Sequence, residues 1–175
     1  MMIPTGYMAK SVVNKPDWLP ANGVEDIYSV SGCISKDFAD YINFWKHNGH
    51  WLFNSPEVIE QVAREQSIDL AGTTMFYYEV YEREFDDEKE LWCPYQSDQS
   101  FTTNILLPEC KILSGFDVVS SDCSPLSCNS IASEILTNSH CLLSDFETAK
   151  QLVETGRFNN SEPGPYRIFA VYTLE

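Results

Sequence analysis

Basic residues are scarce in this chain. Eleven Lys and Arg stand against 26 Asp and Glu among 175 residues, which gives a formal net charge of −15 at pH 7. A surface with this balance repels nucleic-acid phosphates and anionic membranes. Binding to nucleic acid or to a membrane surface is therefore not expected, whereas an acidic surface attracts basic proteins and speeds their encounter.

Long apolar runs are also missing. No stretch approaches the roughly 20 apolar residues that span a bilayer. Residues 1–10 lack the basic and apolar regions of a secretory signal, so we expect a cytoplasmic protein. Thiols stay reduced in that compartment, and we therefore predict free cysteines rather than disulfides. The six cysteines are Cys33, Cys93, Cys110, Cys123, Cys128 and Cys141.

The sequence has no phosphate-binding loop. Neither a Gly-x-Gly-x-x-Gly pattern nor a Gly-Lys followed by Ser or Thr occurs in it. Both patterns cradle phosphates with backbone N–H groups, so nucleotide chemistry lacks its usual signature here. We predict no cofactor, no bound metal and no assigned catalytic residue.

The two halves of the chain resemble each other at an offset of about 90 residues, which is the first signature to look for in a repeated architecture. A one-residue slip then aligns Val80 and Tyr81 with Val171 and Tyr172. The matched residues are Ser31, Cys33, Asn48, His50, Leu52, Glu57 and Gln61 in the first half, and Ser121, Cys123, Asn138, His140, Leu142, Glu147 and Gln151 in the second.

Each half predicts the same order of elements: strand, helix, short strand, helix, long strand. In the first half these are a strand over 26–31, a helix from Ser35, a short strand over 50–53, a helix opened by Ser55 and Pro56, and a strand over 73–84. In the second they are a strand over 112–120, a helix over 125–136 capped by Ser124, a short strand over 140–143, a helix opened by a capping box at 144–147, and a strand over 166–174.

These elements predict one α+β domain over residues 1–175, with a mixed or antiparallel sheet and helices packed on it. A hydrophobic content of 43% supports a real core. We expect residues 1–23 to form an irregular lead-in, 24–84 the first repeat, 85–110 an acidic and aromatic connector that packs or makes a hairpin, and 111–175 the second repeat. The two copies are expected to pair around a pseudo-twofold axis.

An acidic cluster at the end of the first half predicts a surface that binds a basic protein. Carboxylates there alternate with aromatic side chains, which serve as rigid anchors at interfaces. The simpler interpretation is a solvated strand end. The predicted partner-binding residues are Tyr77, Glu79, Tyr81, Glu82, Glu84, Asp86, Asp87, Glu88, Glu90 and Trp92.

Cysteine and histidine permit two further hypotheses. Equivalent positions in the repeats suggest a zinc site of Cys33, Cys123, His50 and His140, although buried thiols are the favoured interpretation. A nucleophilic thiol at Cys123 or Cys128 is the other hypothesis, because both flank a predicted helix start. His140 would serve as its base, oriented by Glu134 or Asp122.

Taken together, these features favour a non-enzymatic cytoplasmic binding protein. Its most concrete form is an acidic inhibitor or immunity-type protein that occludes a basic partner such as a toxin or nuclease. The alternative is a small Cys/His-dependent enzyme acting in a cleft between the repeats.

Overall fold

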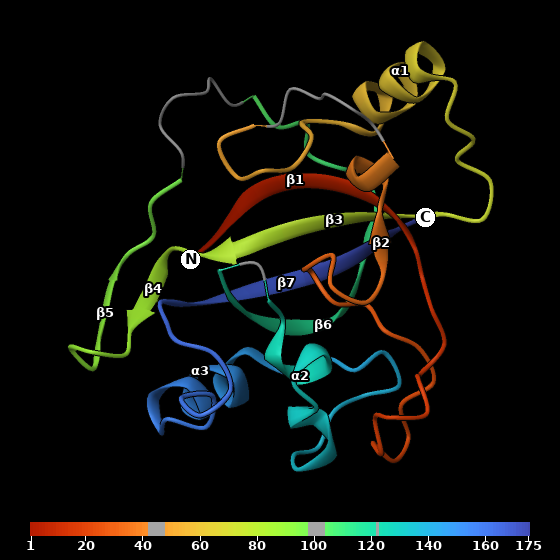
Figure 1. Ribbon diagram of the computed structural model, residues 1–175. Helices are drawn as coiled ribbons and strands as arrows, with labels where there is room; N and C mark the ends of the chain where they lie inside the picture. The colour runs from red at the N-terminus through yellow and green to blue at the C-terminus, as the bar shows by residue number, and fades with distance from the viewer. Residues whose placement is uncertain (42–47, 98–103, 122) are drawn as a thin grey trace.

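Two long strands form the middle of the sheet in the computed structural model, which describes residues 1–41, 48–97, 104–121 and 123–175 (Figure 1). These strands are β3 (Thr74–Tyr81) and β7 (Tyr166–Leu174), and they pair antiparallel. β1 (Met2–Ser11) pairs with the other side of β3, and β6 (Lys111–Ser120) with the other side of β7. Across the described ranges the sheet has seven strands, all paired antiparallel, and the predicted α+β class is confirmed.

The prediction for the N-terminal segment is wrong, because residues 2–11 form strand β1 rather than an irregular arm. Pro4 and Gly6 are residues that usually interrupt a strand. Instead the register with β3 shifts between them, and Gly6 adopts a φ of 133° in the resulting bulge. On its other edge β1 pairs with the short strand β2 (Lys36–Asp37), but only at Lys10 and Ser11. Pro4 lies outside this pairing, so its missing N–H removes no hydrogen bond between β1 and β2.

The long strand predicted over 73–84 divides at Glu82. β3 ends at Tyr81, and β4 (Arg83–Asp86) turns away to pair with β5 (Leu91–Pro94). A hairpin is therefore present, as expected for residues 85–110, but its first strand begins at Arg83, within the range predicted for the first repeat. It joins the main sheet where Phe85 pairs with Tyr166 of β7.

The two longer helices agree with their predicted positions. α1 (Pro56–Gln66) begins after Ser55, whose Oγ accepts a hydrogen bond of 3.2 Å from the N–H of Val58. α3 (Phe146–Glu154) is capped by Asp145 rather than by the predicted Ser144. Figure 1 shows the two helices at opposite ends of the strand order, α1 near β1 and α3 near β6. No helix among the described residues has the length and apolar character needed to cross a bilayer.

Other predicted elements are shorter than expected or missing. The helix over 125–136 is reduced to α2 (Pro125–Cys128) and a 3-10 turn, Ile131–Ser133. The helix from Ser35 is a 3-10 turn, Phe38–Tyr41, and its predicted continuation over 42–47 lies outside the described residues. The strand predicted over 26–31 is wrong, since only an isolated bridge at Asp26 is present there.

A loop in the first half closes over the bulge at Gly6. The Asn48 Oδ1 accepts hydrogen bonds from the N–H groups of His50 (2.8 Å) and Leu52 (3.2 Å), and its Nδ2 donates to the Thr5 carbonyl (2.8 Å). Phe53 and Tyr7 then exchange backbone hydrogen bonds. The short strand predicted over 50–53 is therefore a single bridge to β1.

A loop in the second half has the same hydrogen bonds. The Asn138 Oδ1 accepts from the N–H groups of His140 (2.9 Å) and Leu142 (3.1 Å), and its Nδ2 donates to the Ser114 carbonyl (2.7 Å). Phe116 and Leu143 exchange backbone hydrogen bonds beside the second bulge, at Gly115. The short strand predicted over 140–143 is likewise a single bridge.

Both bulge glycines are expected to resist substitution. A Cβ at Gly6 would lie 2.5 Å from the Phe53 carbonyl oxygen, and one at Gly115 would lie 2.7 Å from the Leu142 Cβ. Positive φ adds strain to this overlap, so Gly6→Ala and Gly115→Ala should each lower the free energy of unfolding by about 3 kcal/mol. Urea denaturation measures this loss.

Gly23→Ala and Gly72→Ala are the matched controls. Both glycines have positive φ, yet a Cβ there meets no atom within 4 Å. Each of these two substitutions should therefore lower the free energy of unfolding only by the conformational strain, about 1 kcal/mol. Equal losses at all four positions would show that the loops do not pack on the bulges.

Candidate functional site

A pocket of about 830 Å³ opens between the two halves of the chain. Met8 of β1, Val119 of β6 and Phe169 of β7 contribute apolar side chains to it. Its polar lining includes Asp37, His50, Glu84, Tyr95 and Arg167. The pocket is therefore built from both predicted repeats and from the β4–β5 hairpin.

His50 is held in place at this pocket. Its Nδ1 lies 2.9 Å from the Tyr95 hydroxyl, and the two rings are stacked at 5.7 Å. Arg167 lies over the Tyr95 ring at 5.0 Å and donates a hydrogen bond of 2.8 Å to Glu84. Burial, followed by the positive charge of Arg167, lowers the pKa of His50. The imidazole is therefore neutral at pH 7 and able to exchange hydrogen bonds with a polar ligand.

Next to the pocket, the buried side chain of Lys10 binds residues 29–31 and Asp37. Its side chain is fully buried, and its ammonium donates to the carbonyls of Ser29 (2.8 Å), Val30 (2.9 Å) and Ser31 (3.0 Å). The same ammonium makes an ion pair of 2.8 Å with Asp37. One buried cation thus fixes the backbone of residues 29–31, which explains why this segment does not form the predicted strand.

Asp117 holds the same segment from β6. Its Oδ2 accepts hydrogen bonds from the Val30 N–H (2.8 Å) and from the Ser124 hydroxyl (2.7 Å). The Ser124 Oγ in turn accepts from the Ser31 N–H at 3.2 Å. Ser124 precedes α2 but does not cap it, because its hydroxyl is committed to these contacts. Burial raises the pKa of Asp117 to about 6.

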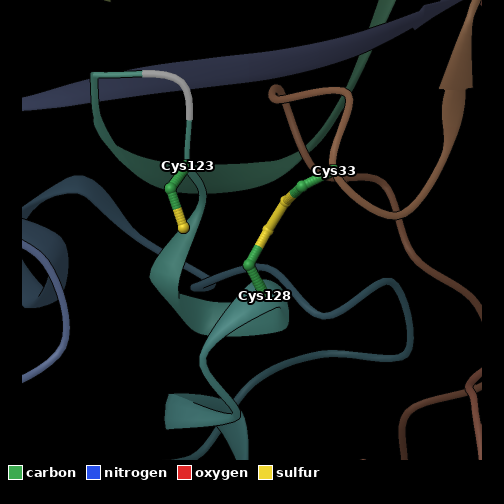
Figure 2. A group of neighbouring side chains, drawn as sticks. All are labelled: Cys33, Cys123 and Cys128. Atoms are coloured by element: carbon green, nitrogen blue, oxygen red, sulfur yellow. A yellow bond between two sulfur atoms is a disulfide. The ribbon is translucent and has the colours of Figure 1, made fainter.

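Three cysteines meet where this segment approaches α2. The Sγ atoms of Cys33, Cys123 and Cys128 all lie within 4.8 Å of one another (Figure 2). In this structure Cys33 and Cys128 are joined by a disulfide, so the prediction that all six cysteines are free is wrong for this pair. Residues 29–31, fixed by Lys10 and Asp117, bring Cys33 to the helix.

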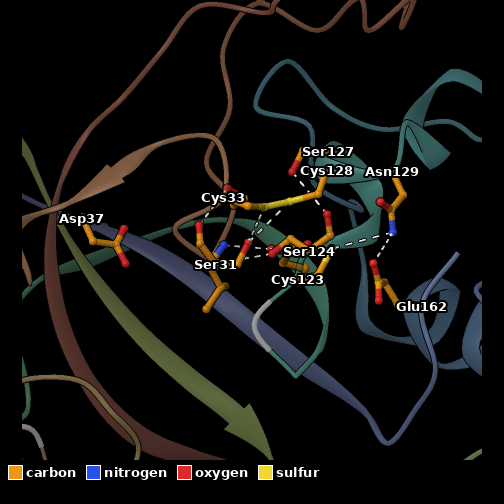
Figure 3. The surroundings of a disulfide bond; sticks show 12 residues. Ser31, Cys33, Asp37, Cys123, Ser124, Ser127, Cys128, Asn129 and Glu162 are labelled. Atoms are coloured by element: carbon orange, nitrogen blue, oxygen red, sulfur yellow. Dashed lines mark hydrogen bonds between the residues drawn. A yellow bond between two sulfur atoms is a disulfide. The ribbon is translucent and has the colours of Figure 1, made fainter. Parts of the chain in front are cut away.

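The third thiol, Cys123, has polar neighbours. Asn129 donates from its Nδ2 to the Cys123 Sγ at 3.7 Å and to Glu162 at 3.3 Å (Figure 3). The Ser31 hydroxyl lies 3.1 Å from the Cys33 Sγ and 3.7 Å from the Cys128 Sγ. Burial, followed by the negative charges of Glu162 and Asp117, raises the pKa of the Cys123 thiol to about 11.

The ligand set of the predicted zinc site is not brought together. His50 contacts Tyr95, whereas the His140 Nδ1 lies 2.6 Å from the Asp26 carboxylate and its ring stacks on Tyr28 at 3.9 Å. Cys128 joins Cys33 and Cys123 instead, and it does not belong to the predicted ligand set. The spacing of five residues from Cys123 to Cys128 is the sequence feature that indicates Cys128 as a possible ligand.

The contacts of the thiol also differ from those of an activated nucleophile. A raised pKa leaves Cys123 protonated at neutral pH. His140 is engaged with Asp26 and Tyr28, and Glu134 pairs with Arg157 at 3.0 Å. Asp122, the other proposed orienting group, lies outside the described residues.

Within the predicted acidic surface, Tyr77 is a core residue. Its ring is fully buried, and its hydroxyl donates to Glu79 at 3.2 Å. Glu79 also accepts from the Tyr172 hydroxyl at 3.1 Å and forms an ion pair with Lys111. Tyr77 is therefore inaccessible to a partner in this conformation, because the alternating strand is covered on both faces.

The other aromatic anchors are partly buried. Tyr81 packs edge-on against Trp92 at 5.5 Å and against Phe146 at 4.8 Å. Trp92 donates from its Nε1 to Glu154 at 2.7 Å. These rings therefore attach the β4–β5 hairpin to α3.

Most of the predicted acidic side chains have partners within the chain. Glu82 pairs with the N-terminal amine at 2.7 Å, and Glu84 with Arg167 at 2.8 Å. Asp86 pairs with Lys89 at 2.9 Å, and Asp87 accepts from the N–H of Gly164 at 3.1 Å. Glu88 and Glu90, in the β4–β5 turn, are exposed.

Comparison of the chain with models of protein families, with curated proteins and with solved structures finds no significant match to any of them. Function must therefore be inferred from the contacts described above.

Proposed function

We propose that this chain is a non-enzymatic binding protein, an acidic inhibitor or immunity-type protein that occludes a basic partner such as a toxin or nuclease. The observation that carries the proposal is the β4–β5 hairpin, which projects beyond the edge of the main sheet and bears an acidic turn (Figure 1). The net charge of −15 favours encounter with a basic surface.

The hairpin is held rigidly enough to serve as a contact surface. Trp92 packs edge-on against Phe85 with their ring centroids 5.1 Å apart. At the turn, the Asp86 Oδ1 accepts hydrogen bonds from the N–H groups of Glu88 (3.1 Å) and Lys89 (3.0 Å). A preorganised turn loses little conformational entropy on binding, which supports a tight complex.

The turn combines charge with an apolar contact. Glu88 and Glu90 are exposed, and Leu91 beside them is 45% exposed. Carboxylates at the rim steer a basic partner, while an apolar side chain gains affinity when it is desolvated. The proposed contact surface is therefore the turn of the hairpin, with Tyr77 excluded from it because that ring is buried.

Affinity capture from the cells of origin tests this proposal. Tagged wild type is compared with a Glu88→Lys and Glu90→Lys double variant, and with Glu60→Lys and Glu65→Lys on the exposed face of α1 as a control with the same change of charge. We expect wild type and the α1 variant to recover one stoichiometric basic protein at moderate salt. The hairpin variant should recover at least tenfold less, or about 1.4 kcal/mol in affinity.

Equal recovery by all three proteins would contradict the proposal. Recovery of many basic proteins, lost at modest salt, would instead indicate nonspecific attraction to a negative surface. Circular dichroism of each variant checks that the fold is retained.

We also propose that the two halves are copies of one unit, as the sequence similarity predicts. The support is the matched loops at Asn48 and Asn138, each bonded to a glycine bulge, and the position of each loop before a helix. The central pairing is symmetric as well. In the alignment of the two halves Val80 matches Val171 and Tyr78 matches Phe169, and in the sheet Tyr78 lies opposite Val171 while Val80 lies opposite Phe169.

A further inference from the structure

The cluster of Cys33, Cys123 and Cys128 fits a small thiophilic cation. A Zn–S bond is about 2.3 Å, so sulfurs that share a tetrahedral ion lie about 3.8 Å apart. All three Sγ atoms are already within 4.8 Å of one another (Figure 2). Once the Cys33–Cys128 disulfide is reduced, its two sulfurs must separate to this spacing, and rotation of side chains whose Cα atoms lie 6.5 Å apart achieves it.

The backbone that carries these sulfurs is fixed from both sides. Lys10 holds the carbonyls of residues 29–31, and Ser124 binds the N–H of Ser31 just before Cys33. Ser124 also links Cys123 to α2, which bears Cys128. A binding site whose ligands are positioned before the ion arrives loses little entropy on binding.

Hydrogen-bonding groups lie next to all three sulfurs. The Asn129 amide donates to the Cys123 Sγ, and the Ser31 hydroxyl lies beside the sulfurs of both other cysteines (Figure 3). Hydrogen bonds of this kind orient and stabilise ligating thiolates. Cys33 is exposed and the other two cysteines are partly buried, so an ion has a path from solvent.

We propose that the reduced protein binds one thiophilic divalent cation, of the Zn²⁺ class, through Cys33, Cys123 and Cys128. Binding converts three thiols to thiolates and releases three protons. The disulfide form excludes the ion, since two of its three ligands then share a covalent bond. Reduction by a dithiol restores both thiols with two electrons and two protons, and the reductant leaves as its own disulfide.

Titration of the reduced, chelator-treated full chain with Co²⁺ tests the proposal. We expect one equivalent to bind, with a thiolate-to-cobalt charge-transfer band that Zn²⁺ abolishes. Cys123→Ser should weaken binding at least ~100-fold, since losing a ligand exceeds the loss of a supporting hydrogen bond. Cys110→Ser is the matched control, an exposed cysteine outside the cluster, and should leave binding unchanged.

Alkylation of the cysteines, mapped by mass spectrometry, provides a second readout on the folded protein. With Zn²⁺ bound, Cys33, Cys123 and Cys128 should be protected, while Cys110 reacts at the same rate with and without the ion. Absence of the charge-transfer band from reduced wild type would overturn the proposal. Equal Co²⁺ affinity of the Cys123→Ser and Cys110→Ser variants, or Zn²⁺-dependent protection at other cysteines, would overturn it as well.

Discussion

Replacing Lys10 by Met is expected to lower the free energy of unfolding by about 3–5 kcal/mol, the range for removing one partner of a buried charge network. The variant leaves the Asp37 carboxylate without its ammonium and leaves the carbonyls of Ser29, Val30 and Ser31 without their donor. Burial of unpaired polar groups is what makes the change costly. Urea denaturation followed by circular dichroism measures the loss.

Lys36→Met is the matched control. Lys36 lies on β2, which pairs with β1, and it is exposed, so the same change of side chain should alter stability by less than about 0.5 kcal/mol. A double variant, Lys10→Met with Asp37→Leu, should cost less than the sum of its parts, because either single change already breaks the same Lys10–Asp37 ion pair. A loss below about 1 kcal/mol for Lys10→Met alone would show that the ammonium does not hold residues 29–31.

The elements that the sequence predicts well are those whose cause is local. α1 follows from Ser55, Pro56 and a stripe of apolar residues, and the N-cap hydrogen bond forms as expected. β7 spans the predicted residues because its apolar and aromatic run is bounded by a Pro-Gly-Pro turn. Local caps, turns and periodicity therefore suffice for these elements.

The elements that the sequence misses depend on distant partners. β1 was obscured by Pro4 and Gly6, which usually interrupt strands, and only pairing with β3 makes the bulge at Gly6 a stable feature. Residues 26–31 have the composition of a strand. Their backbone groups are instead taken by Lys10 and Asp117, and nothing in the sequence indicates that a lysine on a strand is fully buried.

The cluster of Cys33, Cys123 and Cys128 also depends on distant partners, and the sequence predicts only two of its three members. The similarity of the two halves predicts that Cys33, Cys123, His50 and His140 lie together, because they occupy equivalent positions. Each histidine is instead engaged by nearby groups, Tyr95 for His50 and Asp26 for His140. Cys33 and Cys123 do meet, but their third member, Cys128, has no cysteine at the matched position in the first half.

A pH dependence with an unusual sign is expected from Asp117. Burial raises the pKa of this carboxyl to about 6 in the folded protein, from an unfolded value near 3.8. Between these values the folded state binds more protons than the unfolded state, so the contribution of Asp117 to stability falls as pH rises from about 4 to about 6. A shift of about 2 pKa units corresponds to roughly 3 kcal/mol.

Comparison with Asp117→Asn isolates this contribution, because the amide does not titrate. The groups that face Asp117 include Lys10, whose charge lowers its pKa, and Tyr78, whose own pKa is raised far above this range. Lost hydrogen bonds to Val30 and Ser124 give the variant a constant offset at every pH. From pH 4 to pH 7, wild type should lose roughly 3 kcal/mol of unfolding free energy relative to the variant.

Asp145→Asn is the control with the opposite sign. Hydrogen bonds from Thr148 lower the pKa of Asp145, so its contribution is present above an unfolded pKa near 3.8 and is lost as pH falls through the folded value. Urea denaturation of wild type and both variants from pH 3 to pH 7 measures the two slopes. A constant difference between wild type and Asp117→Asn over pH 4–7 would show that this carboxyl keeps an ordinary pKa. The hydrogen bonds from Val30 and Ser124 and the charge of Lys10 would then fully offset the cost of burying the Asp117 carboxylate.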